Sequence, residues 1–121
     1  MQKIKIEDGI HKLTATGYAY DYSDSYVFVI DGIAYCLFED DVDEYRSEVG
    51  IKIIEKGQFA CYPIPETEVK IESDFELGLD SYLIMRNPKD DSIIFSADNA
   101  GDYYYPVAAL SYSPQNLPIN Q

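Results

Sequence analysis

Residues 25–38, SYVFVIDGIAYCLF, place Asp31-Gly32 between two short runs rich in valine, isoleucine and aromatic residues. Such runs favour β-strands, and an Asp-Gly pair favours a type I′ turn, in which both central residues need a positive φ. The stretch therefore predicts a two-residue β-hairpin. It also sets the period of two that most of the chain follows.

The same pattern of short strands and turns extends over the whole chain. Apolar and polar residues alternate in KIKI, KLTATGYAYDY, GIKIIEK, QFACYPI, SYLIMRN, SIIFSA and VAALSYS. Eight or nine short strands predict a mostly β protein, an antiparallel β-sandwich or barrel of about eight strands. A chain of 121 residues is expected to form a single acidic, β-rich domain, residues 1–121, and its proline-containing end, residues 113–121, a flexible tail.

One segment departs from the period of two. In EDDVDEYRSEVG, the apolar residues Val42, Tyr45 and Val49 recur at intervals of three and four, which is a helical stripe. Acidic residues at the start of this stripe suit a helix N-terminus, and Gly50 suits a helix end. The sequence therefore predicts one short helix at about residues 41–49.

The charge of the chain limits the classes of partner that are expected. It carries 22 acidic and 9 basic residues, a net charge of -13 at pH 7. Direct binding to nucleic acid or to an anionic membrane is not expected, because both depend on lysine and arginine. Cationic partners are favoured instead: a basic protein surface, a cationic ligand or a metal ion. The many tyrosines and phenylalanines argue against a disordered acidic chain, so the charge belongs to a folded domain.

The stretch ETEVKIESDFELGLD, residues 66–80, places acidic side chains on alternate residues. If residues 66–77 are extended, one face carries a row of five carboxylates interrupted by Lys70, and the other face packs on the core. The row consists of Glu66, Glu68, Glu72, Asp74 and Glu76. It is interpreted either as a solvated face that protects a sheet from aggregation or as a binding surface. A bend near Ser73-Asp74 would divide it, because acidic residues are poor strand formers.

The predicted helix would carry a second acidic ridge, formed by Asp40, Glu44 and Glu48 at four-residue intervals. Favourable charge at a helix N-terminus explains Asp40 and Glu44 by capping alone, but it does not explain Glu48 at the other end. Two rigid elements with regularly spaced carboxylates would imitate the charge pattern of a nucleic-acid backbone.

This pattern gives the leading functional hypothesis. The protein is expected to be an acidic, non-enzymatic inhibitor that binds and occludes a basic, nucleic-acid-binding protein, attracted by opposite potentials. An immunity protein against a nuclease toxin fits this description, and so does a phage anti-restriction or anti-CRISPR protein that acts as a nucleic-acid mimic.

Tyrosines give a second candidate contact. Tyr103, Tyr104 and Tyr105 are consecutive, so they cannot all face one core, and at least one is expected to be exposed at an interface. The alternating tyrosines of GYAYDY are better explained by cross-strand packing. Two alternatives to the inhibitor follow: a β-sandwich module that binds a small ligand or glycan through tyrosines, and a structural or assembly protein whose sheet edges pair.

Catalysis and metal binding have little support in the sequence. His11 is the only histidine and lies beside no nucleophile motif, and the acidic residues are too numerous for their spacing to select a catalytic pair. We expect no enzymatic activity, no cofactor and no metal. Cys36 and Cys61 form no metal or redox motif and are expected to be reduced and buried, with a disulfide as the alternative. A cytoplasmic location is expected from an N-terminus without the apolar run of a signal peptide, and the reduced state of the cysteines follows from that location.

Overall fold

The computed structural model describes residues 4–100 and 105–118, which form one antiparallel sheet of eight strands. The strands are β1 (Gly9–Ala19), β2 (Ser25–Ile30), β3 (Ile33–Asp41), β4 (Ser47–Ile53), β5 (Phe59–Asp74), β6 (Tyr82–Arg86), β7 (Ile93–Asn99) and β8 (Ala108–Tyr112). Two short 3-10 helices are η1 (Gly78–Asp80) and η2 (Pro114–Asn116). The strand order is β4-β3-β2-β1-β5-β6-β7-β8, so the predicted antiparallel β fold is confirmed.

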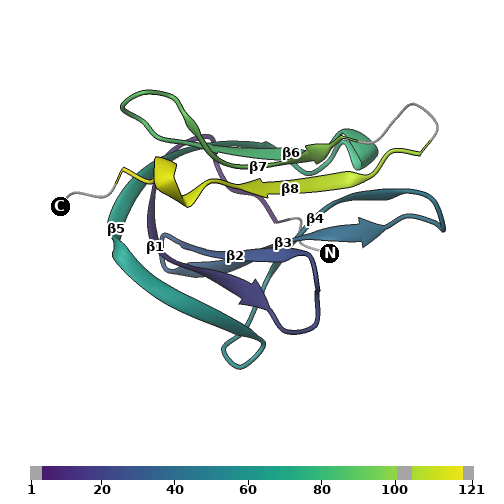
Figure 1. The fold of residues 1–121 in the computed structure, drawn as a ribbon, viewed down its shortest axis with the longest axis horizontal. Coiled ribbons are helices and arrows are strands. Elements are labelled where there is room, and N and C mark those ends of the chain that lie inside the picture. The colour runs from purple at the N-terminus through teal and green to yellow at the C-terminus, as the bar shows by residue number, and fades with distance from the viewer. Residues whose placement is uncertain (1–3, 101–104, 119–121) are drawn as a thin grey trace.

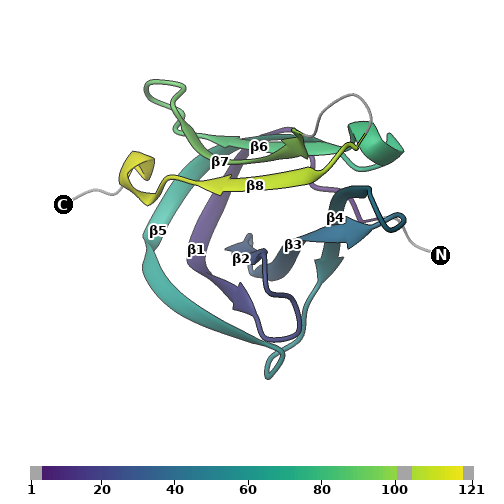
Figure 2. The same cartoon turned by 45° about the vertical axis from the view of Figure 1, so that its right-hand side comes forward.

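The sheet folds over on itself into two layers. Figure 1 shows β6, β7 and β8 above β2, β3 and β4, with the long strands β1 and β5 curving between the layers. The 45° turn in Figure 2 shows the same curvature. At the corner the register of β1 shifts between Leu13 and Ala15, opposite Pro63 and Pro65 of β5. Because proline has no backbone N–H to donate to the ladder, it interrupts regular pairing and accompanies the bend.

The two edge strands, β4 and β8, meet at Ser47. The backbone N–H of Ser47 donates to the carbonyl of Pro106 over 3.1 Å, and the N–H of Ala108 donates to Ser47 Oγ over 2.9 Å. Within the described residues, β4 and β8 do not pair further along their length. The fold is therefore a sandwich whose layers are joined at one end, as in a partly closed barrel.

The main core lies between the two layers. Its largest fully buried side chains include Phe28 and Phe95, whose rings meet at 4.8 Å, and Tyr112 packs against both. A smaller cluster lies on the other face of β2 and β3, where Val27 and Cys36 are fully buried. Strand pairing with alternate residues on opposite faces accounts for both clusters.

The hairpin predicted at Asp31-Gly32 is confirmed. Asp31 has φ 51° and Gly32 has φ 81°, and Ile30 pairs directly with Ile33 across the turn. Asp31 also ties the turn to β1, because its N–H donates to the carbonyl of Lys12 over 2.9 Å.

The prediction of a helix at residues 41–49 is wrong. β3 continues to Asp41 and β4 begins at Ser47, and the turn between them is closed by a hydrogen bond from the N–H of Val42 to the carbonyl of Arg46. Gly50, which was expected to end the helix, lies in the middle of β4 opposite Phe38. The ring of Phe38 fills the space that a side chain at position 50 would occupy. Strand pairing with β3 overrides the helical stripe here.

The start of the chain differs from the predicted first strand. Residues 4–6, the described part of the run KIKI, do not belong to the sheet, although Ile6 is buried in the core. Near the other end, η2 is fixed by a hydrogen bond from Asn116 Nδ2 to the carbonyl of Ile93, and Leu117 packs against the core. Residues 119–121 of the expected tail lie outside the described residues. No helix in the described part of the chain is long and apolar enough to cross a membrane.

Candidate protein-binding surface

The first part of the predicted acidic row lies on one face of β5. Glu66, Glu68 and Glu72 are exposed, whereas the residues between them, Thr67, Val69 and Ile71, are buried. The predicted alternation is therefore present from residue 66 to residue 72. Because successive strand residues point to opposite faces, the three carboxylates share the outer face of the sheet.

Basic side chains from the neighbouring strands occupy the same face. Lys12 of β1 pairs directly with Glu68, and its Nζ lies 3.8 Å from a carboxylate oxygen of Glu66. Lys70 pairs directly with Arg86 of β6 and contacts Asp91 at 3.7 Å. The face of β5 is thus a surface of mixed sign, which favours the interpretation of the row as a solvated face at this point.

The row ends where β5 ends. Asp74 is the last residue of β5, and its carboxylate accepts a hydrogen bond from the N–H of Glu76 over 2.9 Å. The chain turns there, close to the expected bend at Ser73-Asp74. Glu76 consequently lies in a groove beside β4, together with Asp40 and Glu48, rather than in line with the β5 carboxylates.

The second predicted ridge exists in a different form. Asp40 of β3 and Glu48 of β4 are direct cross-strand partners, so their carboxylates lie on the same face of the hairpin. Glu44 is exposed in the turn between the two strands. The ridge is therefore carried by a β-hairpin, which brings Asp40 and Glu48 closer together than a helix would.

The strongest concentration of carboxylates lies where the β1–β2 loop meets β3. A hollow there is lined by Asp21 and Asp24 from the loop and by Glu39, Asp40 and Asp41 from β3. We call these five residues and the neighbouring Glu48 the acidic end. Sequence reasoning did not select Asp21, Asp24, Glu39 or Asp41, because the contact between the loop and β3 comes from the hairpin arrangement of β1, β2 and β3.

The carboxylates of the acidic end affect one another. The pKa of Glu39 is raised above its usual value, first by burial and then by the negative charges of Asp24 and Asp41. No ion pair within residues 4–100 and 105–118 involves a member of the acidic end. Repulsion at this end is therefore not relieved by ion pairs in the described part of the chain.

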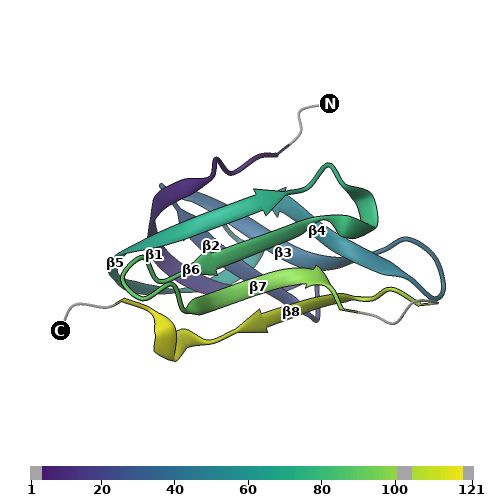
Figure 3. The ribbon, with the colours of Figure 1, turned by 90° about the horizontal axis from the view of Figure 1, so that it is seen from above.

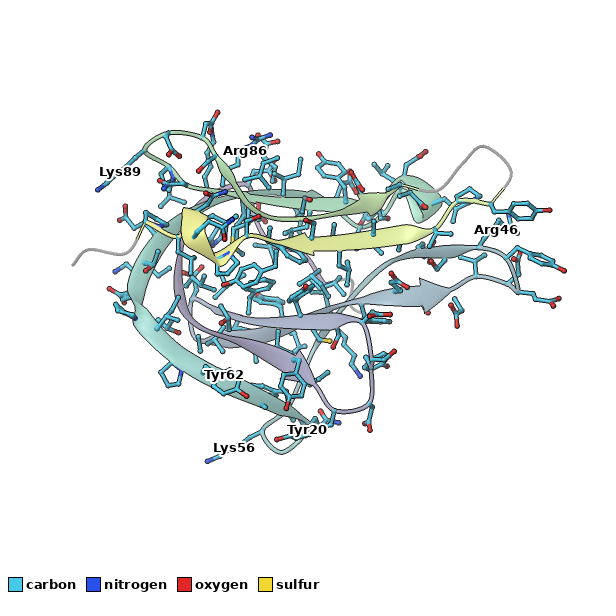
Figure 4. The ribbon with its side chains drawn as sticks, in the orientation of Figure 1. Tyr20, Arg46, Lys56, Tyr62, Arg86 and Lys89 are labelled. Carbon is cyan, nitrogen blue, oxygen red and sulfur yellow. The ribbon has the colours of Figure 1, made fainter. Side chains whose placement is uncertain are left out.

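The basic residues nearby are engaged elsewhere. Arg46, at the tip of the β3–β4 hairpin, donates from Nε to Asp43 over 2.7 Å. Lys52 lies over the ring of Tyr22 at 4.3 Å and donates to its hydroxyl over 3.1 Å. Figure 4 shows Arg46 at one end of the molecule and Arg86 and Lys89 toward the other.

Packing holds the acidic end in place. Ser25, which is buried, accepts a hydrogen bond from the N–H of Ala19 and donates one to the carbonyl of Tyr22, so the β1–β2 loop is fixed at both sides. The ring of Tyr22 packs against that of Phe38 at 4.6 Å. The loop carboxylates are thus presented on a supported backbone next to β3, as a preorganised binding surface requires.

The predicted tyrosine contact is described in part. Tyr105 is exposed, and its ring lies 5.4 Å from that of Tyr45, which is also exposed, in the β3–β4 turn. Tyr103 and Tyr104 lie outside the described residues. The pair formed by Tyr45 and Tyr105 places exposed aromatic rings beside the β3–β4 hairpin that carries Asp40 and Glu48.

The two cysteines differ in their surroundings. Both thiols are free, so the alternative of a disulfide is not what the structure shows. Cys36 is buried, as expected, and burial raises the pKa of its thiol. Cys61 is exposed on β5, so the prediction that it is buried is wrong. Cys61 lies near the start of β5, before the corner at which this strand enters the main core.

No arrangement of three or more histidine, cysteine or carboxylate side chains among the described residues could hold a metal ion. No protein-family model, curated protein or solved structure matches the chain.

Proposed function

We propose that the protein is an acidic, non-enzymatic inhibitor that binds and occludes a basic, nucleic-acid-binding protein. An immunity protein against a nuclease toxin and a phage anti-restriction or anti-CRISPR protein are the two forms of this function that fit its size and charge. The proposal is carried by the acidic end, where carboxylates from the β1–β2 loop and β3 surround one hollow without ion pairs to described basic residues.

The physical reason is the cost of such an arrangement. Like charges that face one another destabilise a fold. The pKa of Glu39 is raised first by burial and then by the repulsion of Asp24 and Asp41. A cationic partner surface would relieve the repulsion on binding and would be attracted over long range. The β5 face is a weaker candidate, because Lys12, Lys70 and Arg86 lie among its carboxylates.

A pair of charge-reversal variants tests the proposal. Asp24→Lys with Asp41→Lys changes the acidic end, and Glu66→Lys with Glu68→Lys makes the same change of charge on the β5 face. Each variant and the parent would be immobilised and used to capture proteins from the producing cell and its natural host at low salt. Elution with a salt step, identification by mass and a cleavage or nucleic-acid-binding assay of the captured protein would follow.

We expect the parent and the β5 variant to retain a basic nucleic-acid-binding protein and to inhibit its activity on nucleic acid. The acidic-end variant should bind that protein at least about tenfold more weakly, because charge pairs at an interface contribute strongly. Retention that is equal for all three proteins, or that is insensitive to salt, would contradict the proposal. Far-UV circular dichroism would confirm that both variants are folded.

A second candidate function is favoured by a different observation. Tyr18 and Tyr20 are exposed with their rings at 6.0 Å, and Tyr62 is exposed at 60% on the adjacent strand β5. Figure 4 shows Tyr20 and Tyr62 on the same side of the molecule. Exposed aromatic rings at a sheet surface suit a module that binds a glycan or small ligand. Binding that is lost in Tyr62→Ala and unaffected by salt would support this alternative.

A cytoplasmic location is part of the proposal. It is supported by the free thiols of Cys36 and Cys61, since free cysteines are typical of proteins in reducing compartments. Fractionation of the producing cell, with antibodies to the protein, would test it.

A further inference from the structure

β4 is an edge strand whose outer side is, among the described residues, unpaired beyond Ser47. Its register with β3 is fixed by the hydrogen bonds from the N–H of Ile54 to the carbonyl of Ala34 and from the N–H of Val42 to the carbonyl of Arg46. In an antiparallel pair, hydrogen-bonded residues alternate along each strand. The even-numbered residues of β4 therefore bond to β3, and the odd-numbered residues direct their N–H and C=O groups away from it.

Most of that outer side has no partner in the described part of the chain. Ser47 forms the two hydrogen bonds that join the layers: its N–H donates to the carbonyl of Pro106, and its Oγ accepts from the N–H of Ala108. No backbone hydrogen bond of Val49, Ile51 or Ile53 to another described segment is present. Ile53 is also exposed at 54%. This edge is a row of donors and acceptors that an added strand could use.

The other edge of the sheet is protected in ways that β4 is not. β8 has five residues, and Pro106 and Pro114 lie close to its two ends. Short length and nearby prolines are common means of blocking an edge. In β4, the basic side chain that could protect the edge, Lys52, is held against Tyr22. β4 is therefore the edge that remains open to pairing.

A groove of about 460 Å³ runs beside this edge. Val49 and Ile51 of β4 form one wall, and Ile4 and Phe75 lie among the residues that face them. The segment containing η1 packs next to β4 in Figures 1 and 2, and Figure 3 shows the β3–β4 hairpin from above. Besides these apolar residues, the lining includes three carboxylates, Asp40, Glu48 and Glu76.

The outer face of the β3–β4 hairpin supplies the polar part of this lining. Asp40 and Glu48 form the cross-strand pair at one end, and the ring of Phe38 lies over Gly50 next to them. A guanidinium group pairs well with carboxylates and packs on aromatic faces. This face is therefore suited to an arginine or lysine side chain, whereas the inner wall is suited to an aliphatic one.

We propose that the β4 groove binds an extended segment of the partner protein by strand addition to β4, and that this segment alternates cationic and apolar residues. Successive side chains of an added strand point to opposite faces. Cationic side chains then meet Asp40 and Glu48, and the apolar ones enter the groove beside Val49 and Ile51. This inference rests on the proposed function and specifies how the basic partner is recognised.

A second copy of this chain is a poorer occupant. Pairing of two β4 edges would place the Asp40–Glu48 pair of each copy near the other, and like charges in neighbouring strands repel. Each copy also carries a net charge of -13. A basic segment of another protein removes this repulsion, so charge complementarity selects it.

Amide hydrogen exchange of the full chain with a synthetic probe tests the proposal. The probe is a short peptide in which arginine and valine alternate, and its control has the same composition with the arginines grouped. We expect the alternating peptide to slow exchange at the amides of Val49, Ile51 and Ile53. The amides of Glu48, Gly50 and Lys52, already bonded to β3, should change little.

Two neutralised variants provide the matched control. Asp40→Asn with Glu48→Gln should weaken binding of the alternating peptide about tenfold, whereas Glu66→Gln with Glu68→Gln, which removes the same charge, should leave affinity within about twofold. If the peptide binds with a steep salt dependence but the odd-numbered β4 amides stay unprotected, strand addition is wrong and the electrostatic function stands.

The remaining outcomes are also decisive. Protection of the odd-numbered amides without any effect of salt or of either variant would support strand addition and contradict the charge-based function. Absence of peptide binding, or equal binding of the alternating and grouped peptides, would overturn the inference. Protection of the same amides in the protein alone, with a dimer in sedimentation analysis, would assign the edge to a second copy.

Discussion

Asp40 and Glu48 face each other directly across β3 and β4, two carboxylates in the position where a stabilising pair would have opposite charges. Glu68 stands in the contrasting position, directly opposite Lys12 on the neighbouring pair of strands β1 and β5. The same sheet thus contains a repulsive and an attractive cross-strand pair. The carboxylates of Asp40 and Glu48 therefore do not stabilise the sheet, whereas the carboxylate of Glu68 does.

Glu48→Lys is expected to raise the free energy of unfolding by about 0.5 kcal/mol, because it converts a like-charge pair into an opposite-charge pair. Glu68→Lys should lower it by about the same amount, since it places a lysine opposite Lys12. Urea denaturation at low ionic strength measures both effects, and added salt should reduce them. A stabilisation by both substitutions would show that net charge, rather than the cross-strand pairs, controls the result.

His11 and Asp31 predict a dependence of stability on pH. Burial alone lowers the pKa of His11, but its hydrogen bonds to Asp31 and to the carbonyl of Glu7 outweigh burial and raise the pKa above the usual 6.5. The hydrogen bond from His11 lowers the pKa of Asp31 below 3.8, assisted by the N–H of Lys12. Protonated His11 therefore stabilises the fold below pH 6.5, and the stabilisation is lost as the pH rises through its raised pKa.

The parent should lose a few tenths of a kcal/mol of stability, roughly, when the pH rises from 6 to 8, an effect limited by the solvent exposure of Asp31. His11→Gln should remove this part of the pH dependence. Asp31→Asn should remove most of it while keeping the turn, because asparagine also accepts a positive φ. Denaturation curves at several pH values measure the change, and an unaltered slope in both variants would contradict the assignment.

Gly17→Ala is expected to destabilise the protein by roughly 3 kcal/mol. A methyl group at this position would overlap the carbonyl oxygen of Ala60, because β1 and β5 approach closely there. Ser111→Ala on the exposed side of β8 is a suitable control and should change stability by less than about 0.5 kcal/mol. A mild effect of Gly17→Ala in thermal unfolding would mean that β1 and β5 separate easily.

The two thiols should react at very different rates in the native protein. Cys61 is exposed and should be alkylated readily, whereas Cys36 is completely buried and has its pKa raised by that burial. Mass spectrometry after treatment with iodoacetamide should show one modification under native conditions and two in denaturant. Early modification of Cys36 would indicate that the cluster around Val27 and Cys36 opens locally.

Local pattern was sufficient for some elements and misleading for one. Asp31-Gly32 predicts its turn because a type I′ turn needs a positive φ at two residues, and the ability to adopt it depends only on the residues at those two positions. Val42, Tyr45 and Val49 also satisfy a helical period, but Ser47, Val49 and Ile51 satisfy a period of two equally well. Pairing with β3 decides between the two, and that pairing depends on residues beyond the turn.

The class of fold and the sign of the surface follow from the amino-acid sequence, because alternation is a property of neighbouring residues and net charge is a property of the composition. The places where negative charge lacks a basic neighbour depend on how the strands pair. The tertiary structure brings Asp24 near Glu39 and Lys12 opposite Glu68, and among the described residues it leaves the outer side of β4 unpaired beyond Ser47. These relationships join residues that are distant in the chain, so they arise from strand order and register, which no short stretch of sequence specifies.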